Sequence, residues 1–168
     1  MTAWHERAHE ERHLLNPAFC SVLLWQAGKG SFENFNSPRI SLSFNEAFLI
    51  LPLVLHQKTR NSLPSRLISS FPVWINDNPL VVESLPQLAS SLVPYTKAAI
   101  IFGETGELFR FKGDEMLIIL EREPDIRAMV RKTSNEVQQC MKKAHFLGKW
   151  FTHTGSPETI FTLLGIRP

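Results

Sequence analysis

The sequence contains little cysteine, little net charge and no long apolar run. Only two of its 168 residues are cysteines, Cys20 and Cys140, and both stand within apolar helical patterns. We therefore expect two reduced core thiols rather than the disulfide framework of a small secreted domain. The net charge of +2 is too small to indicate nucleic-acid binding by itself.

The apolar segments are too short to cross a membrane. The longest, residues 47–55, is interrupted by Pro52 and falls well short of the ~20 apolar residues of a membrane-spanning helix. The charged first residues do not resemble a signal peptide. We expect a cytoplasmic protein with no membrane partner.

The composition otherwise fits one globular domain covering residues 1–168. With 43% hydrophobic and 20% charged residues, the chain can bury a core and is unlike a disordered protein. Within it we distinguish a charged variable N-terminus (residues 1–10), a polar loop (residues 31–43) and a terminal docking helix (residues 156–168). The polar loop is the best candidate for a segment that is disordered or ordered only by a partner.

Apolar periodicity predicts helices in the first two thirds of the chain. A helix over residues 6–27 should kink or restart at Asn16-Pro17, with Asn16 as its N-cap. Gly28 and Gly30 should end it, because glycine is a poor helix former.

A second helix is expected over residues 44–61, with a bend at Pro52. Its centre is apolar all round, which indicates burial on most sides, and its basic last turn faces the negative end of the helix dipole. Further helices are expected over residues 65–76 and 80–102, the latter either as one helix or as two pieces divided by its prolines.

The periodicity then changes from helix to strand. Residues 107–112 and 115–120 are strand-like runs around a Gly113-Asp114 turn, which predicts a β-hairpin. Residues 121–131 are expected to be irregular. The pattern Thr133-Ser134-Asn135-Glu136 is a capping box for a long helix that ends at Gly155.

This order of elements predicts a mostly α domain with one β-hairpin, in a winged-helix-like arrangement. The last helix should start at Ser156, with Pro157 in its first position. Its apolar side chains crowd one and a half turns, and a terminal segment frays unless it is tied down. The helix should therefore dock, either on its own core or on another protein.

Two overlapping His-Glu-x-x-His patterns, at His5–His9 and His9–His13, match the zinc-protease motif. A catalytic helix of this kind is buried, whereas this segment is charged, and a third ligand from His56 or His153 is unsupported. We favour a solvated helix face and expect no metal site.

Other catalytic constellations are weaker still. Both cysteines belong to apolar faces, the environment of inert thiols. The segment Gly103–Gly106 lacks the Lys-Ser/Thr signature of a phosphate-binding loop. We expect no enzyme activity and no cofactor.

A DNA-binding alternative depends on the hairpin and the last long helix. A winged helix places a recognition helix in the major groove, flanked by a basic wing. The candidate DNA-facing residues are Arg110, Lys112, Lys142, Lys143 and Lys149. A solvated helix face explains the lysines as well, and winged helices also serve as protein-binding modules.

A protein-binding interpretation accounts for more of the sequence. It covers the apolar terminal helix, the polar loop and the tryptophans, since tryptophan is a favoured interface anchor. The four tryptophans are Trp4, Trp25, Trp74 and Trp150. Each of them could equally fill the core.

Three stretches carry a resemblance to a known family. They are residues 11–20, residues 48–56 with the following Lys58-Thr59-Arg60 and Leu63-Pro64, and residues 155–168. In order and spacing they resemble the middle component of bacterial three-component ABC systems, and the resemblance covers nearly the whole chain from Glu11 onward.

The resemblance implies a small non-catalytic adaptor between an SMC- or Rad50-like ABC ATPase and an effector, often a nuclease. Such conflict systems include Lamassu-type anti-phage and anti-plasmid defence. The adaptor would sit at the ATPase heads, meet DNA only through the complex, and hold the effector inactive until foreign DNA is sensed. The alternative function is a DNA-binding winged-helix module or regulator.

The family has no established catalytic residues to carry over. From its motifs and the last long helix we select candidate partner-binding residues: Asn16, Pro17, Phe19, His56, Thr59, Arg60, Trp150, Ile160, Phe161, Leu164 and Arg167.

Overall fold

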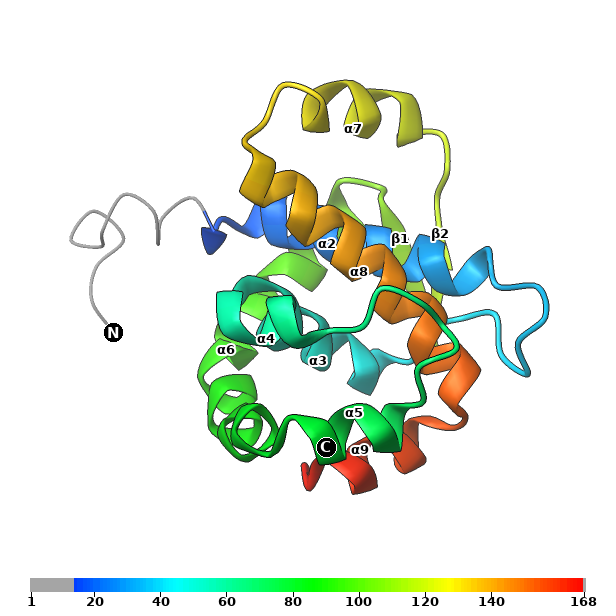
Figure 1. The fold of residues 1–168 in the computed structure, drawn as a ribbon. Coiled ribbons are helices and arrows are strands. Elements are labelled where there is room, and N and C mark those ends of the chain that lie inside the picture. The colour runs from blue at the N-terminus through cyan, green and yellow to red at the C-terminus, as the bar shows by residue number, and fades with distance from the viewer. Residues whose placement is uncertain (1–13, 168) are drawn as a thin grey trace.

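The computed structural model describes residues 14–167, and Figure 1 shows their arrangement. The elements are α2 (Pro17–Phe32), α3 (Phe44–Leu55), α4 (Gln57–Ser62), α5 (Phe71–Asp77), α6 (Pro79–Thr105), β1 (Phe109–Lys112), β2 (Glu115–Ile118), α7 (Glu123–Val130), α8 (Asn135–Thr154) and α9 (Pro157–Leu164). The mostly α class with one β-hairpin is confirmed, while the winged-helix-like arrangement stays a prediction.

Helices α2 and α8 form the centre of the molecule and cross at very short range. A Cβ atom added to Gly30 would lie 2.0 Å from the backbone oxygen of His145, and one added to Gly148 would lie 1.8 Å from that of Ala27. Only glycine permits this approach. The predicted helix end at Gly28 and Gly30 is therefore wrong, because these glycines are packing positions in a helix that continues to Phe32.

The start of α2 agrees with the sequence. Asn16 adopts an extended backbone conformation, and its side-chain oxygen accepts a 2.8 Å hydrogen bond from the Ala18 N–H. Pro17 occupies the first turn, where it costs no backbone hydrogen bond. Residues 1–13, which include the His-Glu-x-x-His patterns, lie outside the described residues.

The second predicted helix is divided into α3 and α4 at His56. Helix α3 keeps Pro52 in its interior and is buried over most of its length, as expected. Arg60 of α4 folds back so that its Nη1 donates to the backbone oxygens of Val54 and Leu55 at 2.8 and 3.3 Å. The basic group thus binds the free carbonyls at the end of α3.

Helices α5 and α6 differ from their predicted bounds. The chain from residue 63 to 70 is irregular, and α5 begins only at Phe71. Helix α6 runs without a break from Pro79 to Thr105, although it contains Pro86 and Pro94. Its buried stripe against α2 and α3 compensates for the backbone hydrogen bonds that the prolines remove.

The hairpin follows the predicted turn. Phe109 pairs with Ile118 and Lys112 with Glu115 in an antiparallel register, and Gly113 adopts a left-handed conformation with φ of 62°. The segment just before α3 lies along the other edge of β2, since the Met116 N–H donates to the Leu42 oxygen at 2.9 Å and Ser43 forms an antiparallel bridge with Glu115.

The predicted irregular stretch 121–131 is wrong, because it contains α7. Glu123 and Asp125 stand in the first turn beside Pro124, a combination that favours a helix start. The capping box at Thr133 is also absent: Ser134 is the N-cap, and its hydroxyl accepts from the Val137 N–H at 3.4 Å.

The polar loop is held by the body of the protein. Arg39 forms a two-pronged ion pair with the buried Glu46, with distances of 2.9 and 2.7 Å, and its Nε donates to the Gly155 oxygen at 2.7 Å. Glu46 also completes a capping box with Ser43 at the start of α3. These contacts within the chain order the loop, so no partner is needed to order it.

Helix α9 closes the opposite end of the molecule from α7 (Figure 1). Ser156 caps it and Gly165 ends it in a left-handed conformation, as the sequence indicates. Ile160, Phe161 and Leu164 are at most 5% exposed. The apolar face of the terminal helix therefore docks inward, on the core of its own chain. No helix within residues 14–167 is long and apolar enough to cross a membrane.

Candidate interaction surface

The structure separates the predicted partner-binding residues into two groups. The first group lies in the core or in buried contacts, with exposures of 5% or less: Thr59, Arg60, Trp150, Ile160, Phe161 and Leu164. Trp150 packs against Phe71 with ring centroids 4.6 Å apart and donates its indole N–H to the Ser69 oxygen at 2.8 Å. In this fold these side chains hold the domain together, and Phe161 in addition lines a hollow beside α3.

The second group reaches the surface but does not form one patch. Asn16 and Phe19 line a hollow beneath α7, whereas His56 lines a hollow beside α6 and Arg167 lines another beside α3. Pro17 stands half-buried beside Asn16. The Asn16 to Phe19 segment contributes two predicted residues to one hollow, and the hollow beside α3 is lined by Arg167 together with the largely buried Phe161.

That hollow is the apolar groove, defined here by residues of α2, α6, α7 and α8 around a volume of about 560 Å³. Phe19 and Val22 form one wall, and Ile126 and Met129 of α7 form the roof. At its rim, Phe102 and Met129 are 48% and 49% exposed. Exposed apolar side chains around a concave surface are typical of protein-binding sites.

Helix α7 stands apart from the other helices at one end of the molecule (Figure 1), and its residues line the groove. Ile126 is its only buried residue within the part of the chain described. Two hollows flank α7, namely the apolar groove and a second hollow on its other side. Ile126 and Val130 of α7, four residues apart, line both of them, and so does Met141 of α8. A helix held by one apolar stripe is a segment of low local stability.

The second hollow, of about 380 Å³, is the basic hollow, which lies between α7 and the C-terminal half of α2. Trp25, Ile126 and Met141 give it an apolar floor. Its charged lining residues are Lys29, Arg127, Arg131, Lys142 and the single acidic Glu123. Four cations facing one carboxylate give this surface a positive potential.

Glu123 is already shared between two of these cations. Lys29 lies 2.5 Å from it across the hollow, and Arg127 pairs with it along α7. The hydrogen bond from Lys29 holds the pKa of Glu123 below its ordinary value, and Arg127 acts in the same direction. The negative charge of Glu123 is thus already paired with two cations of the same chain.

A second ion cluster lies at the edge of the basic hollow. His145 Nε2 is 2.7 Å from Glu33 Oε2. Burial lowers the pKa of His145 and outweighs the hydrogen bond to Glu33, which acts the other way. Burial alone would raise the pKa of Glu33, but the hydrogen bond with His145 and the charge of Lys29 lower it. A neutral imidazole facing a carboxylate therefore predominates at neutral pH.

The predicted DNA-facing residues have different contacts in the structure. Arg110 lies 3.7 Å from Glu107, and Lys112 is exposed on the hairpin. The ammonium group of Lys143 donates to the Leu63 and Pro64 oxygens at 2.9 and 3.1 Å, so it fastens the loop before α5. Lys149 lies 4.0 Å from Glu33. Lys142 lines the basic hollow.

The two cysteines are core thiols and lie apart from the surface. Burial raises the pKa of Cys20 to about 12 and that of Cys140 to about 11, so both thiols are protonated, as the sequence predicts for core cysteines. Within residues 14–167, no group of three His, Cys, Asp or Glu side chains could hold a metal ion.

Sequence reasoning named Trp25 as a possible interface anchor but missed the other residues that shape the two hollows, namely Lys29, Phe102, Ile126, Met129, Val130 and Arg131. The signal was present in the irregular segment. An acidic-Pro-acidic start at Glu123 precedes apolar residues at the i, i+3 and i+4 spacing of Ile126, Met129 and Val130, which is typical of a helix with one buried face.

The fold and its surfaces define a small helical binding domain with an apolar groove and a basic hollow on the two flanks of one exposed helix. Residues 4–168 match the family described as ABC-three component (ABC-3C) system Middle Component 3. The chain belongs to this family and is thus a middle component of an ABC three-component system. Comparison with curated proteins and with solved structures found no match.

Proposed function

We propose that this chain is a non-catalytic adaptor that links an SMC- or Rad50-like ABC ATPase to an effector in a Lamassu-type defence complex. The effector is a nuclease that the complex holds inactive until foreign DNA is sensed, and the complex acts in the cytoplasm against phages and plasmids. DNA is met through the complex. Membership of the middle-component family is the observation that carries the proposal.

The apolar groove supports a binding role and gives the adaptor a docking face. Its rim exposes Phe102 and Met129 to about half their full extent, and the motif residues Asn16 and Phe19 line it. Interfaces derive most of their energy from a few apolar anchors in such hollows. The groove therefore replaces the buried residues of α9 as the proposed contact.

Co-expression with the other components of its system tests this role. The tagged chain should capture the ATPase and the effector, and the double substitution Phe102→Asp with Met129→Asp should abolish capture of at least one of them. The matched control is Ile68→Asp with Leu80→Asp, two residues that are 89% and 79% exposed and do not line the groove. Thermal unfolding checks that each variant is folded.

Effector control needs a second assay. The reconstituted complex should cleave a plasmid only after linear DNA and ATP are added, and omission of this chain should uncouple cleavage from that signal. Capture of neither component by the wild-type chain contradicts the proposal. Salt-sensitive DNA binding by the chain alone would favour the DNA-binding alternative instead.

A further inference from the structure

We propose that the basic hollow binds an acidic amphipathic segment of another protein subunit, in which an apolar side chain is flanked by carboxylates. The inference rests on the adaptor function proposed above and names the chemistry of one partner at a second place. It depends on three features of the hollow: unpaired cations, an apolar floor and a concave shape.

The first feature is the presence of cations that the chain does not neutralise. Arg131 and Lys142 line the hollow from the end of α7 and from α8, and neither has an ion pair among the described residues. Glu123 is occupied by Lys29 and Arg127. Two guanidinium or ammonium groups are thus left to receive carboxylates from outside.

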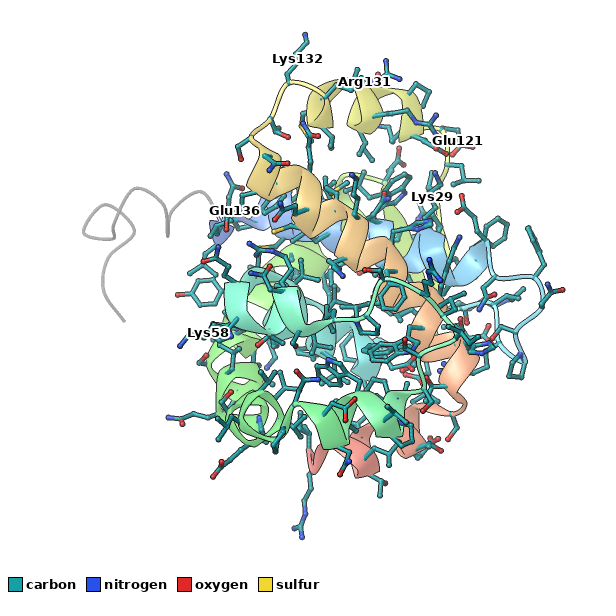
Figure 2. The ribbon with its side chains drawn as sticks, in the orientation of Figure 1. Lys29, Lys58, Glu121, Arg131, Lys132 and Glu136 are labelled. Carbon is teal, nitrogen blue, oxygen red and sulfur yellow. The ribbon has the colours of Figure 1, made fainter. Side chains whose placement is uncertain are left out.

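Both of these cations, Arg131 and Lys142, are exposed to solvent. Figure 2 shows Arg131 and Lys132 at the end of α7, away from the body of the molecule, with Lys29 below α7. Lys132 is exposed and extends the positive charge beyond the hollow. Such a patch accelerates encounter with an acidic partner and selects against a basic one.

The second feature is the apolar floor, which distinguishes a peptide from DNA. Val130 lines the hollow as a partly exposed apolar side chain, and the more deeply buried Trp25 and Met141, 1% and 6% exposed, line it beneath. A phosphate backbone has no apolar group to place against these side chains. An amphipathic helix supplies an apolar residue for the floor and carboxylates for the rim.

The third feature is shape. The hollow of about 380 Å³ lies between two helices, a space suited to one or two side chains rather than to the convex surface of a duplex. Its neighbour across α7, the apolar groove, shares Ile126, Val130 and Met141 with it. A partner seated in the basic hollow therefore also contacts the residues that hold α7 down.

The test is a charge reversal in the intact complex. The double substitution Arg131→Glu with Lys142→Glu should weaken capture of one system component by about tenfold or more, because like charges then meet across the interface. The matched control is Lys58→Glu with Lys97→Glu, which makes the same charge change at two exposed lysines outside the hollow. The control should leave capture within about twofold of wild type.

A photo-crosslinking residue at Gln138, which lines the hollow, identifies the occupant. A crosslink to an Asp/Glu-rich helical segment of another subunit is the expected result. A crosslink to residues 1–13 of the same chain, or charge-reversed protein that still assembles at wild-type affinity, overturns the inference. So does binding of a short DNA duplex that the charge reversal abolishes.

The two proposals fail in different ways. If the wild-type chain captures its partners and the charge reversal has no effect, only the acidic-segment inference falls. If the wild-type chain captures nothing, both the adaptor function and this inference are contradicted.

Discussion

Lys29 lies 2.5 Å from Glu123 and joins the last turn of α2 to the first turn of α7. This ion pair, its extension to Arg127 and the burial of Ile126 are the main attachments of α7 to the body. Both candidate binding surfaces depend on where α7 lies. The position of one short helix thus sets the shape of the whole interaction face.

Glu123→Gln should therefore loosen α7 without unfolding the domain. Loss of the negative charge removes the partner of Lys29 and Arg127. Amide hydrogen exchange over residues 121–131 should accelerate by about tenfold, while exchange in α2 and α8 stays unchanged. Glu107→Gln, at an exposed pair on the hairpin, is the matched control and should alter neither region.

Arg60→Met should destabilise the fold by about 3 kcal/mol, because it removes the donor of two backbone carbonyls and the partner of a half-exposed carboxylate. Arg60 is 1% exposed, and it binds the end of α3 and the Glu136 carboxylate, the latter at 2.9 Å. Its loss leaves buried carbonyls without a donor. Urea unfolding measures the change, and Lys58→Met on the same helix should be nearly neutral. A small loss for Arg60→Met would show that the site relaxes or admits water.

Stability should decrease on acidification, beginning at His145. Burial depresses its folded pKa, so below about pH 6.5 the unfolded chain takes up a proton that folded His145 resists. Glu33, whose folded pKa is also lowered, adds a further loss below about pH 4.3. His145→Gln should flatten the first part of the curve, whereas His153→Gln at an exposed position should not. The free energy of unfolding at several pH values tests this.

Gly148→Ala should cost about 3 kcal/mol or prevent folding. The added methyl would stand 1.8 Å from the backbone oxygen of Ala27, where no flexible side chain can move aside. Gly106→Ala, whose nearest contact lies at 3.1 Å, should change stability by less than about 1 kcal/mol. Equal effects of the two substitutions on the thermal midpoint would contradict the proposed close helix crossing.

Local signals in the sequence predicted the ends of several helices. The helix caps at Asn16 and Ser156 and the turn at Gly113 depend on contacts between residues a few positions apart. The amino-acid sequence alone therefore predicts them. The capping box of Ser43 and Glu46 has the same local character and was readable from the same rule.

Non-local contacts were not predictable in this way. Whether Gly30 ends a helix or lets a second helix approach depends on His145, more than a hundred residues away. The motif residues Arg60 and Phe161 gave the same difficulty, because a pattern in one sequence does not distinguish a core position from an interface position. The burial of these side chains is known only from the fold. Because of it, we place the candidate site at the surfaces around α7 rather than on α9.

The close crossing of α2 and α8 has a consequence for divergence within the family. Its glycines touch backbone atoms, so a substitution there is penalised whatever the partner is. The outward side chains of the eight-residue α7 carry no such restriction. We therefore expect that exchange of one short helix can alter partner specificity while the scaffold stays intact, and transplanting residues 123–130 between relatives should transfer partner preference.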